Sequence, residues 1–196
     1  MMKVIGFNGS PRENGNTRIA INTVFSQLEK NNIETEIINM GEHNIKACTG
    51  CLKCIKMGTG YCALDDDKLN GWLKKAYSAD GIIIGSPVYF ASMTSQAKAL
   101  VDRLGYCARV GGFLLKGKVC CSVAVVRRQG AVCVLNQINN MFLANQTVMP
   151  SSSSWNFAVG RHPGEVRKDE EGMETLKILG ENMAWLLRKV AKNKDV

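Results

Sequence analysis

Short apolar runs recur along the chain, and each has the length of a strand buried in a sheet. The run 81–85 is the clearest, because three isoleucines between two glycines leave both of its faces apolar, as in a central parallel strand. Turn-forming residues close the first run at 8–11 and the third at 86–87. The predicted strands are residues 4–7, 35–39, 81–85, 119–126 and 147–149.

Between and after these runs, apolar residues recur at the three- and four-residue spacing of amphipathic helices. Asp65 is expected to be the N-cap of the second helix. The segment 151–167 shows no period and is predicted to be a long loop. The apolar stripes of the five predicted helices are Ile21, Val24, Phe25 and Leu28; Leu69, Trp72, Leu73 and Ala76; Ala97, Leu100, Val101 and Leu104; Leu135, Ile138 and Phe142; and Leu176, Leu179, Met183, Leu186 and Val190.

The alternation of strands and helices predicts an α/β fold, with a parallel sheet covered by helices on both faces. In such a sheet, ligands bind beyond the carboxyl ends of the strands, so the loops that follow strands are the places to look for a site. No repeat or linker divides residues 1–196, and we expect a single domain.

Composition narrows the class of protein. With 45% apolar and 21% charged residues the chain is ordinary for a globular protein. No apolar run approaches the ~20 residues of a membrane helix, and no signal peptide precedes the first strand, so we expect a cytoplasmic protein that does not bind a membrane. The net charge is +8, but no basic stripe carries interleaved aromatics, and nucleic-acid binding is not expected.

The loop after the first strand, residues 9–17, has the chemistry of an anion site. Unpaired N–H groups at the start of the next helix carry partial positive charge, and Gly9 and Gly15 allow tight bends. The loop matches neither common glycine-rich nucleotide motif, and a plain turn rich in Gly, Pro and Asn is the alternative. The candidate phosphate ligands are Ser10, Arg12, Asn14, Asn16 and Thr17.

A second loop, residues 86–93, follows the third strand and also precedes a helix. Tyr89 and Phe90 come just after Pro87 and offer a flat surface, although alone they could belong to the core. Beside the anion loop they predict a site for a flat heterocycle with a phosphate tail. The candidate residues here are Pro87, Val88, Tyr89, Phe90, Ser92 and Met93.

Three segments together resemble a known family: Gly9-Ser-Pro-Arg with Gly15-Asn-Thr17, Ser86-Pro-Val-Tyr-Phe with Ser92-Met93, and Lys98-Ala-Leu-Val-Asp-Arg103. They are similar to the NAD(P)H-dependent FMN reductase branch of the flavodoxin-like proteins. The resemblance implies a three-layer fold, a five-stranded sheet of order 2-1-3-4-5, and non-covalent FMN with its phosphate on the first loop and its ring against the second. It also implies a third flavin loop, here Arg127, Arg128, Gln129 and Gly130, where two arginines replace the small residues of many relatives.

Four of the eight cysteines lie in an apparent insertion at about residues 44–64, spaced as Cys48-x2-Cys51-x2-Cys54-x7-Cys62. Without an export signal, reduced thiols for metal or redox chemistry are expected rather than disulfides. Three closely spaced thiolates can bind three corners of an iron–sulfur cubane, and a fourth can close it. The run is similar to that of the iron–sulfur flavoproteins. A [4Fe–4S] cluster is favoured; a four-thiolate zinc site and metal-free redox thiols are the alternatives.

The predicted function is an FMN-dependent oxidoreductase. Electrons would pass from NAD(P)H or a ferredoxin-like donor through flavin, with the cluster, to a quinone, dye or other acceptor. Flavin itself takes up hydride, so no catalytic acid–base residue is expected, and His43 and His162 are assigned to structure or solvent contact. A non-enzymatic electron carrier or redox sensor, with the cysteine loop cluster-free or zinc-bound, is the alternative. The resemblance implies a homodimer or homotetramer. Because the cysteine loop follows the second strand, it is expected towards an edge of the sheet, where the flavin it approaches would belong to a neighbouring subunit.

Overall fold

The computed structural model describes residues 1–192, and its strands form one sheet of order β2-β1-β3-β4-β5. Every neighbouring pair in this sheet is parallel. The α/β class and the strand order predicted above are therefore confirmed. The strands are β1 (Lys3–Asn8), β2 (Glu34–Asn39), β3 (Gly81–Pro87), β4 (Val119–Val126) and β5 (Phe157–Val159).

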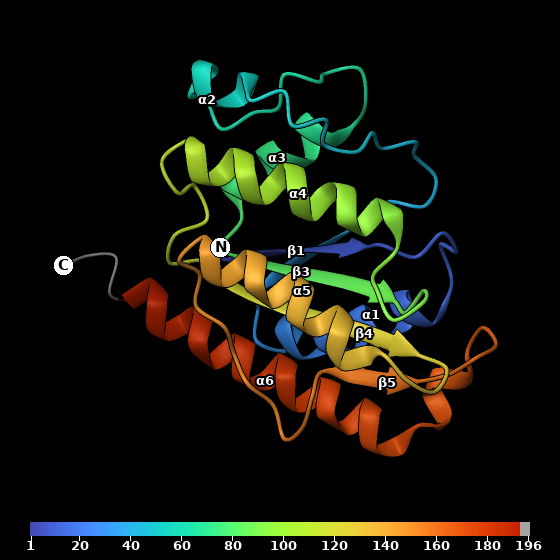
Figure 1. Cartoon of the computed structure of the whole chain (residues 1–196). Helices are drawn as coiled ribbons and strands as arrows, with labels where there is room; N and C mark the ends of the chain where they lie inside the picture. The colour runs from blue at the N-terminus through green and yellow to red at the C-terminus, as the bar shows by residue number, and fades with distance from the viewer. Residues whose placement is uncertain (193–196) are drawn as a thin grey trace.

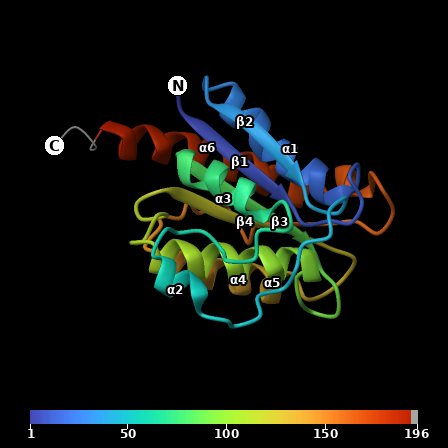
Figure 2. The same ribbon diagram turned by 90° about the horizontal axis from the view of Figure 1, so that it is seen from above.

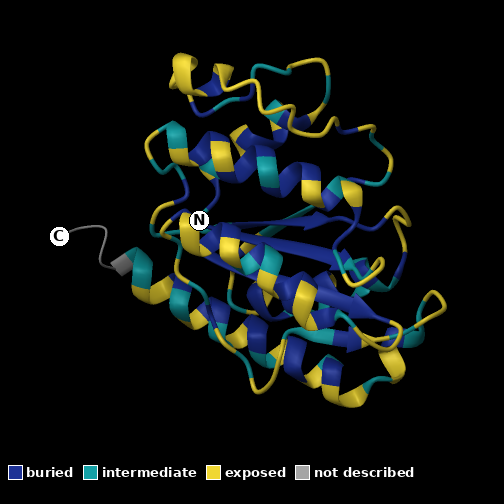
Figure 3. Cartoon of the chain, viewed as in Figure 1, coloured by how far each residue is buried: buried dark blue, intermediate teal, exposed yellow. Residues whose placement is uncertain are grey.

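Helices cover both faces of the sheet, which makes three layers (Figure 1). On one face, α1 (Asn16–Glu29) and α6 (Glu170–Lys192) pack against β-strand side chains such as Val4 and Ile83. On the other lie α3 (Leu69–Ser78), α4 (Ser95–Val110) and α5 (Ala131–Ala144), which bury Phe7 and Ile82 among others. The buried residues gather between these layers (Figure 3). One more short helix, α2 (Lys53–Met57), lies outside α4 (Figure 2).

The fifth strand is not where the hydrophobic pattern placed it. Val148, in the predicted strand 147–149, makes only an isolated bridge beside the start of β4, where it exchanges backbone hydrogen bonds with Lys118 and Cys120. The edge strand is instead Phe157–Val159, paired with residues 124–126 at the carboxyl end of β4. It lies in the predicted loop 151–167, and a 3₁₀ helix, Glu165–Lys168, begins near the end of that loop. Three residues are too few to show a strand period.

The start of the second predicted helix also differs. The helix α3 begins at Leu69 with Lys68 as its N-cap residue, so Asp65 is not the cap. The carboxylate of Asp67 accepts the N–H of Leu69 instead, because it stands two residues before the helix. Asp65 accepts a hydrogen bond from the Asn70 side chain. The sequence pattern also missed α2, whose five residues are too short to display a helical period.

The carboxyl ends of the parallel strands lie at one edge of the sheet (Figure 1). Asn8, at the end of β1, pairs in register with Gly85 near the end of β3. The loops after β1, β3, β4 and β5 therefore start close together. Within residues 1–192, no helix is long and apolar enough to cross a membrane.

Candidate functional site

The loop between β1 and α1 is joined directly to the loop that follows β3. The N–H of Gly9 donates to the carbonyl of Gly85 at 2.8 Å, and the hydroxyl of Thr94 donates to the carbonyl of Gly9 at 2.7 Å. Thr94 is buried and also caps α4, because its oxygen accepts the N–H of Ala97. The sequence pattern did not single out Thr94, although a threonine just before an apolar helical stripe is a recognisable N-cap signal.

A pocket opens between these loops at the carboxyl edge of the sheet. All three loops expected to hold flavin contribute to its wall, so the structure brings them together. A fourth segment, residues 160–163, supplies a further part of the wall that was not predicted. The lining residues are Ser10, Arg12, Gly15, Asn16, Thr17, Pro87, Val88, Tyr89, Val125, Arg127, Gly160, Arg161 and Pro163.

Seven of the predicted flavin residues lie outside that lining. Met93 is buried in the core beside α4, the Ser92 hydroxyl donates to the side chain of Gln137, and Phe90 is fully exposed at a positive φ of 45°. Gly130, also at positive φ, precedes α5. The predicted residues outside the lining are Asn14, Phe90, Ser92, Met93, Arg128, Gln129 and Gly130.

Two hydroxyl side chains of the first loop are buried at the pocket. Ser10 is 5% exposed and Thr17 is 1% exposed. The Ser10 oxygen accepts the backbone N–H of Arg12 at 3.1 Å, which leaves the hydroxyl proton to be donated to an anion. Together with the first N–H groups of α1, this arrangement can bind phosphate.

The side chain of Asn16, a predicted phosphate ligand, lines the pocket and also bonds to the fourth wall segment. Its amide nitrogen donates to the carbonyl of His162 at 2.8 Å, and its oxygen accepts the N–H of Gly164 at 2.7 Å. Both polar atoms are engaged within the protein, so Asn16 holds the fourth wall segment against α1.

The pocket wall carries excess positive charge. Arg12, Arg127 and Arg161 line it, and within residues 1–192 none of these guanidinium groups forms an ion pair. The nearby Glu165 carboxylate accepts the backbone N–H groups of His162 and Arg161, each at 2.8 Å. These two bonds hold the pKa of Glu165 below its ordinary value. The pocket therefore suits an anionic ligand with a flat part against Tyr89.

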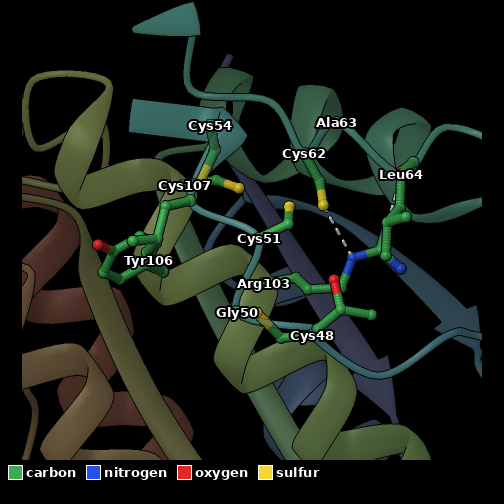
Figure 4. Close-up of a pocket in the computed structure, with 12 residues that line it drawn as sticks. Cys48, Gly50, Cys51, Cys54, Cys62, Ala63, Leu64, Arg103, Tyr106 and Cys107 are labelled. Atoms are coloured by element: carbon green, nitrogen blue, oxygen red, sulfur yellow. Dashed lines mark hydrogen bonds between the residues drawn. The ribbon is translucent and has the colours of Figure 1, made fainter. Parts of the chain in front are cut away.

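The four clustered cysteines line a second pocket, between the cysteine insertion and α4 (Figure 4). The sulfur atoms of Cys51, Cys54 and Cys62 point into the same space. Cys48 and Cys51 are exposed, whereas Cys54 and Cys62 are each 8% exposed. The predicted ligand set is therefore gathered at one place on the surface.

A fifth cysteine, Cys107, lines the same pocket. It is not among the predicted ligands, because it belongs to α4 and is far from the cysteine run in the sequence. Its position one helical turn after Arg103, on the face that the insertion covers, is the signal that could have found it. Burial, and the neighbouring thiols of Cys62 and Cys54, raise the pKa of Cys107 to about 12.

The exposed thiol of Cys51 is shifted in the other direction. The backbone N–H of Lys53 hydrogen-bonds to it and lowers the pKa of Cys51, with a smaller contribution from the Thr49 side chain. A thiol with a lowered pKa carries more thiolate, the form that binds metals and attacks electrophiles. The pKa values of two thiols that line one pocket are thus shifted in opposite directions.

The cysteine insertion rests on a buried ion pair between Arg103 and Asp67, whose side chains are 0% and 2% exposed. Burial pushes the pKa of Asp67 upward, but hydrogen bonds from Arg103 and from the backbone of Leu69 and Lys46 outweigh it and leave the pKa lowered.

Among residues 1–192, no group of three or more His, Cys, Asp or Glu side chains is set to hold a single metal ion.

Known proteins are similar to this chain in sequence or in fold. An iron–sulfur flavoprotein of Methanocaldococcus jannaschii is 37% identical, over 97% of this chain and 100% of its own. One from Archaeoglobus fulgidus is 31% identical, over 93% of this chain and 94% of its own. The structure of RosB with bound 8-demethyl-8-formylriboflavin-5′-phosphate has a TM-score of 0.74 at 18% identity, covering 98% of this chain and 81% of that one.

The RosB likeness shows a common fold. The sequence relationship goes further, because the pattern of the NADPH-dependent FMN reductase family matches residues 2–161. That span includes the phosphate loop, the Tyr89 loop, Arg127 and the cysteine insertion. The chain belongs to the NADPH-dependent FMN reductase family, whose members are flavoprotein oxidoreductases.

Proposed function

We propose that this protein moves electrons from NAD(P)H, or from a ferredoxin-like donor, through FMN and a [4Fe–4S] cluster to a quinone or another small acceptor. The observation that supports the proposal most directly is that one chain has two separate pockets, one lined by arginines and hydroxyl groups and the other by cysteines. A positively charged pocket lies where flavodoxin-like sheets bind ligands, and four cysteines line a second pocket beside α4.

The first pocket fits FMN on the groups that it presents. Ser10, Thr17 and the start of α1 would hold the phosphate, with Arg12 at its side. Pro87, Val88 and Tyr89 give a flat wall for the ring system. FMN supplies the ability to accept a hydride and to release electrons singly. Arg127 places positive charge on the wall, which favours the electron-rich reduced flavin.

The cysteine pocket fits an iron–sulfur cluster better than zinc. A tetrahedral zinc ion with Zn–S bonds of about 2.3 Å would draw four sulfurs to within about 4 Å of one another. The four thiols line one pocket, but three of them come from a single closely spaced run, whereas zinc sites usually take their cysteines from two separate pairs. A cubane binds its thiolates at its outer corners, farther apart. The relatives named iron–sulfur flavoproteins agree with this choice.

The positions of the two pockets support an assembly of subunits. The cysteine insertion lies outside α4 (Figure 1). The flavin pocket lies at the carboxyl edge of the sheet, and the linings of the two pockets share no residue. Leu52, Ile55 and Met57 beside the cysteines are 53%, 48% and 46% exposed. A homodimer or homotetramer that covers these residues would bring the cysteine pocket of one subunit to the flavin of another.

Steady-state kinetics test the proposal. The anaerobically purified protein should oxidise NADH or NADPH continuously when a quinone or a dye is present. The Cys54→Ser variant should lose cluster-dependent transfer to a one-electron acceptor, and Cys133→Ser, at an exposed cysteine of α5, should behave as wild type. If the bound flavin is reduced once and no acceptor gives continuous oxidation of NADH or NADPH, the protein is an electron carrier or a redox sensor instead.

A further inference from the structure

The side chain of Arg103, on α4, is the largest fully buried side chain in the described part of the protein. Burying a guanidinium group is costly unless its N–H groups are paired and hydrogen-bonded. Arg103 meets this demand entirely with residues outside its own helix. Its ion-pair partner is Asp67, and its hydrogen bonds reach the cysteine insertion.

Those hydrogen bonds join the two ends of the insertion. One terminal nitrogen of Arg103 donates to the carbonyl of Lys46 at 3.0 Å, and the other donates to the carbonyl of Leu64 at 2.7 Å. Asp67 completes the arrangement by accepting the backbone N–H of Lys46 at 3.1 Å. Lys46 and Leu64 flank the four cysteines in the sequence, so a single guanidinium holds the base of the loop closed.

The remaining hydrogen bond of Arg103 goes to a sulfur atom. Its Nε–H donates to Sγ of Cys62 across 3.3 Å, as the dashed line in Figure 4 marks. The backbone of Cys62 is fixed separately, because its N–H and carbonyl both bond to the Asn70 side chain, at 2.9 and 2.8 Å. The sulfur therefore stays within reach of the guanidinium, and the planar fork of arginine satisfies several acceptors at once.

We infer that Arg103 is a positioning residue for the cluster. Its side chain closes the base of the cysteine loop and donates a hydrogen bond to the sulfur of the Cys62 ligand. The inference rests on the proposed function, since Cys62 is a ligand only if the cluster binds. A hydrogen bond to a ligating sulfur and a nearby positive charge both stabilise the more negative, reduced cluster. Arg103 thus raises the reduction potential of the cluster as well as shaping its site.

Two measurements on matched variants test the two parts of this role. Arg103→Lys keeps the charge and loses the fork, whereas Arg109→Lys makes the same change at an exposed position on the same helix. In the reduced, metal-free protein, hydrogen exchange of residues 44–68 should be about tenfold faster in Arg103→Lys, the effect of losing a hydrogen bond to a charged group. Arg109→Lys should match wild type.

In the cluster-loaded protein, Arg103→Lys should lower the midpoint potential of the cluster, measured by redox titration with electron paramagnetic resonance, and release iron faster to a chelator. Asp67→Asn keeps the Arg103 donor, so it should speed exchange in the loop while shifting the potential much less. This variant also tests loop closure should Arg103→Lys fail to fold.

Unchanged exchange in Arg103→Lys and Asp67→Asn would overturn loop closure, and an unchanged midpoint potential in Arg103→Lys would overturn the bond to the ligand. Failure of the proposed function looks different: wild-type protein would take up no iron and sulfide on reconstitution. The exchange measurement on metal-free protein would still decide loop closure in that case, and the assignment of Arg103 to the cluster would fall.

Discussion

The side-chain oxygen of Asn16 accepts the backbone N–H of Gly164 at 2.7 Å, although the two residues lie 148 positions apart in the sequence. Its amide nitrogen bonds in turn to the carbonyl of His162. This pair of bonds fastens the segment that carries Arg161 and Pro163 to the start of α1, and so completes the wall of the flavin pocket.

Replacing Asn16 should therefore weaken flavin binding indirectly. In Asn16→Ala the segment 160–164 loses two hydrogen bonds, and we expect the Kd for FMN to rise about tenfold, in line with ~1.4 kcal/mol for such bonds. Quenching of flavin fluorescence during titration measures this. Asn22→Ala, at an exposed position of the same helix, is the control. Equal affinity in the two variants would remove Asn16 from the site.

The two adjacent arginines after β4 should behave differently. Arg127 lines the pocket and Arg128 does not. Arg127→Ala should lower the two-electron midpoint potential of bound flavin by about 30 mV, equivalent to ~1.4 kcal/mol, because the wall loses a positive charge. Arg128→Ala is the neighbouring control and should leave the potential where it is. Spectroelectrochemical titration distinguishes them, and identical shifts would refute the assignment.

The docking of the cysteine insertion on α4 requires the absence of a side chain at Gly111. A Cβ atom there would lie 2.5 Å from the Cα atom of Gly60, so the two backbones could not approach as they do. We expect Gly111→Ala to reduce the free energy of unfolding by about 2 kcal/mol, as overpacking does. Gly71→Ala, within α3 and with open space around it, should not destabilise the protein. Urea denaturation compares the two.

Thiol reactivity should separate Cys51 from Cys107 in the reduced, metal-free protein. The pKa of Cys51 is lowered, so its labelling by iodoacetamide should rise to a plateau at a pH below that of an ordinary thiol. Cys107, with its pKa raised to about 12, stays protonated across the neutral range and should react about 100-fold more slowly at pH 8. Mass spectrometry of labelled peptides measures both rates. Comparable rates would mean that Cys107 is not buried at this pocket.

The sequence alone predicted most of the sheet and the loops that follow its strands. It predicted fewer of the contacts that support the two candidate sites. The isoleucines of residues 82–84 identify a central strand because burial on both faces leaves an unbroken apolar run. Strand order came from resemblance to a family, since periodicity does not say which strands are neighbours. The edge strand at 157–159 is too short to leave a period.

The missed functional contacts share a physical cause. Asn16 meets Gly164, and Arg103 meets Cys62, only because crossover connections bring distant segments together. Residue type and spacing predicted Asn16 as an anion ligand and did not include Cys107 among the metal ligands. Thr94 and Cys107 do have local sequence signals. Thr94 stands at a helix N-cap position, and Cys107 lies one helical turn after Arg103. Such signals place a residue on a helix but do not show which segment packs against it.

One measurement tests the central claim, that a single chain holds both FMN and a four-cysteine iron–sulfur cluster: the iron, sulfide and flavin content of anaerobically purified, reconstituted protein. We predict about four irons and about four sulfides, as a [4Fe–4S] cluster requires, with about one FMN per chain. Cys54→Ser should lose the iron and keep the FMN, and Cys133→Ser should keep both. Wild-type protein that holds FMN but neither iron nor sulfide after reconstitution, or that holds zinc in the four cysteines, would contradict the account.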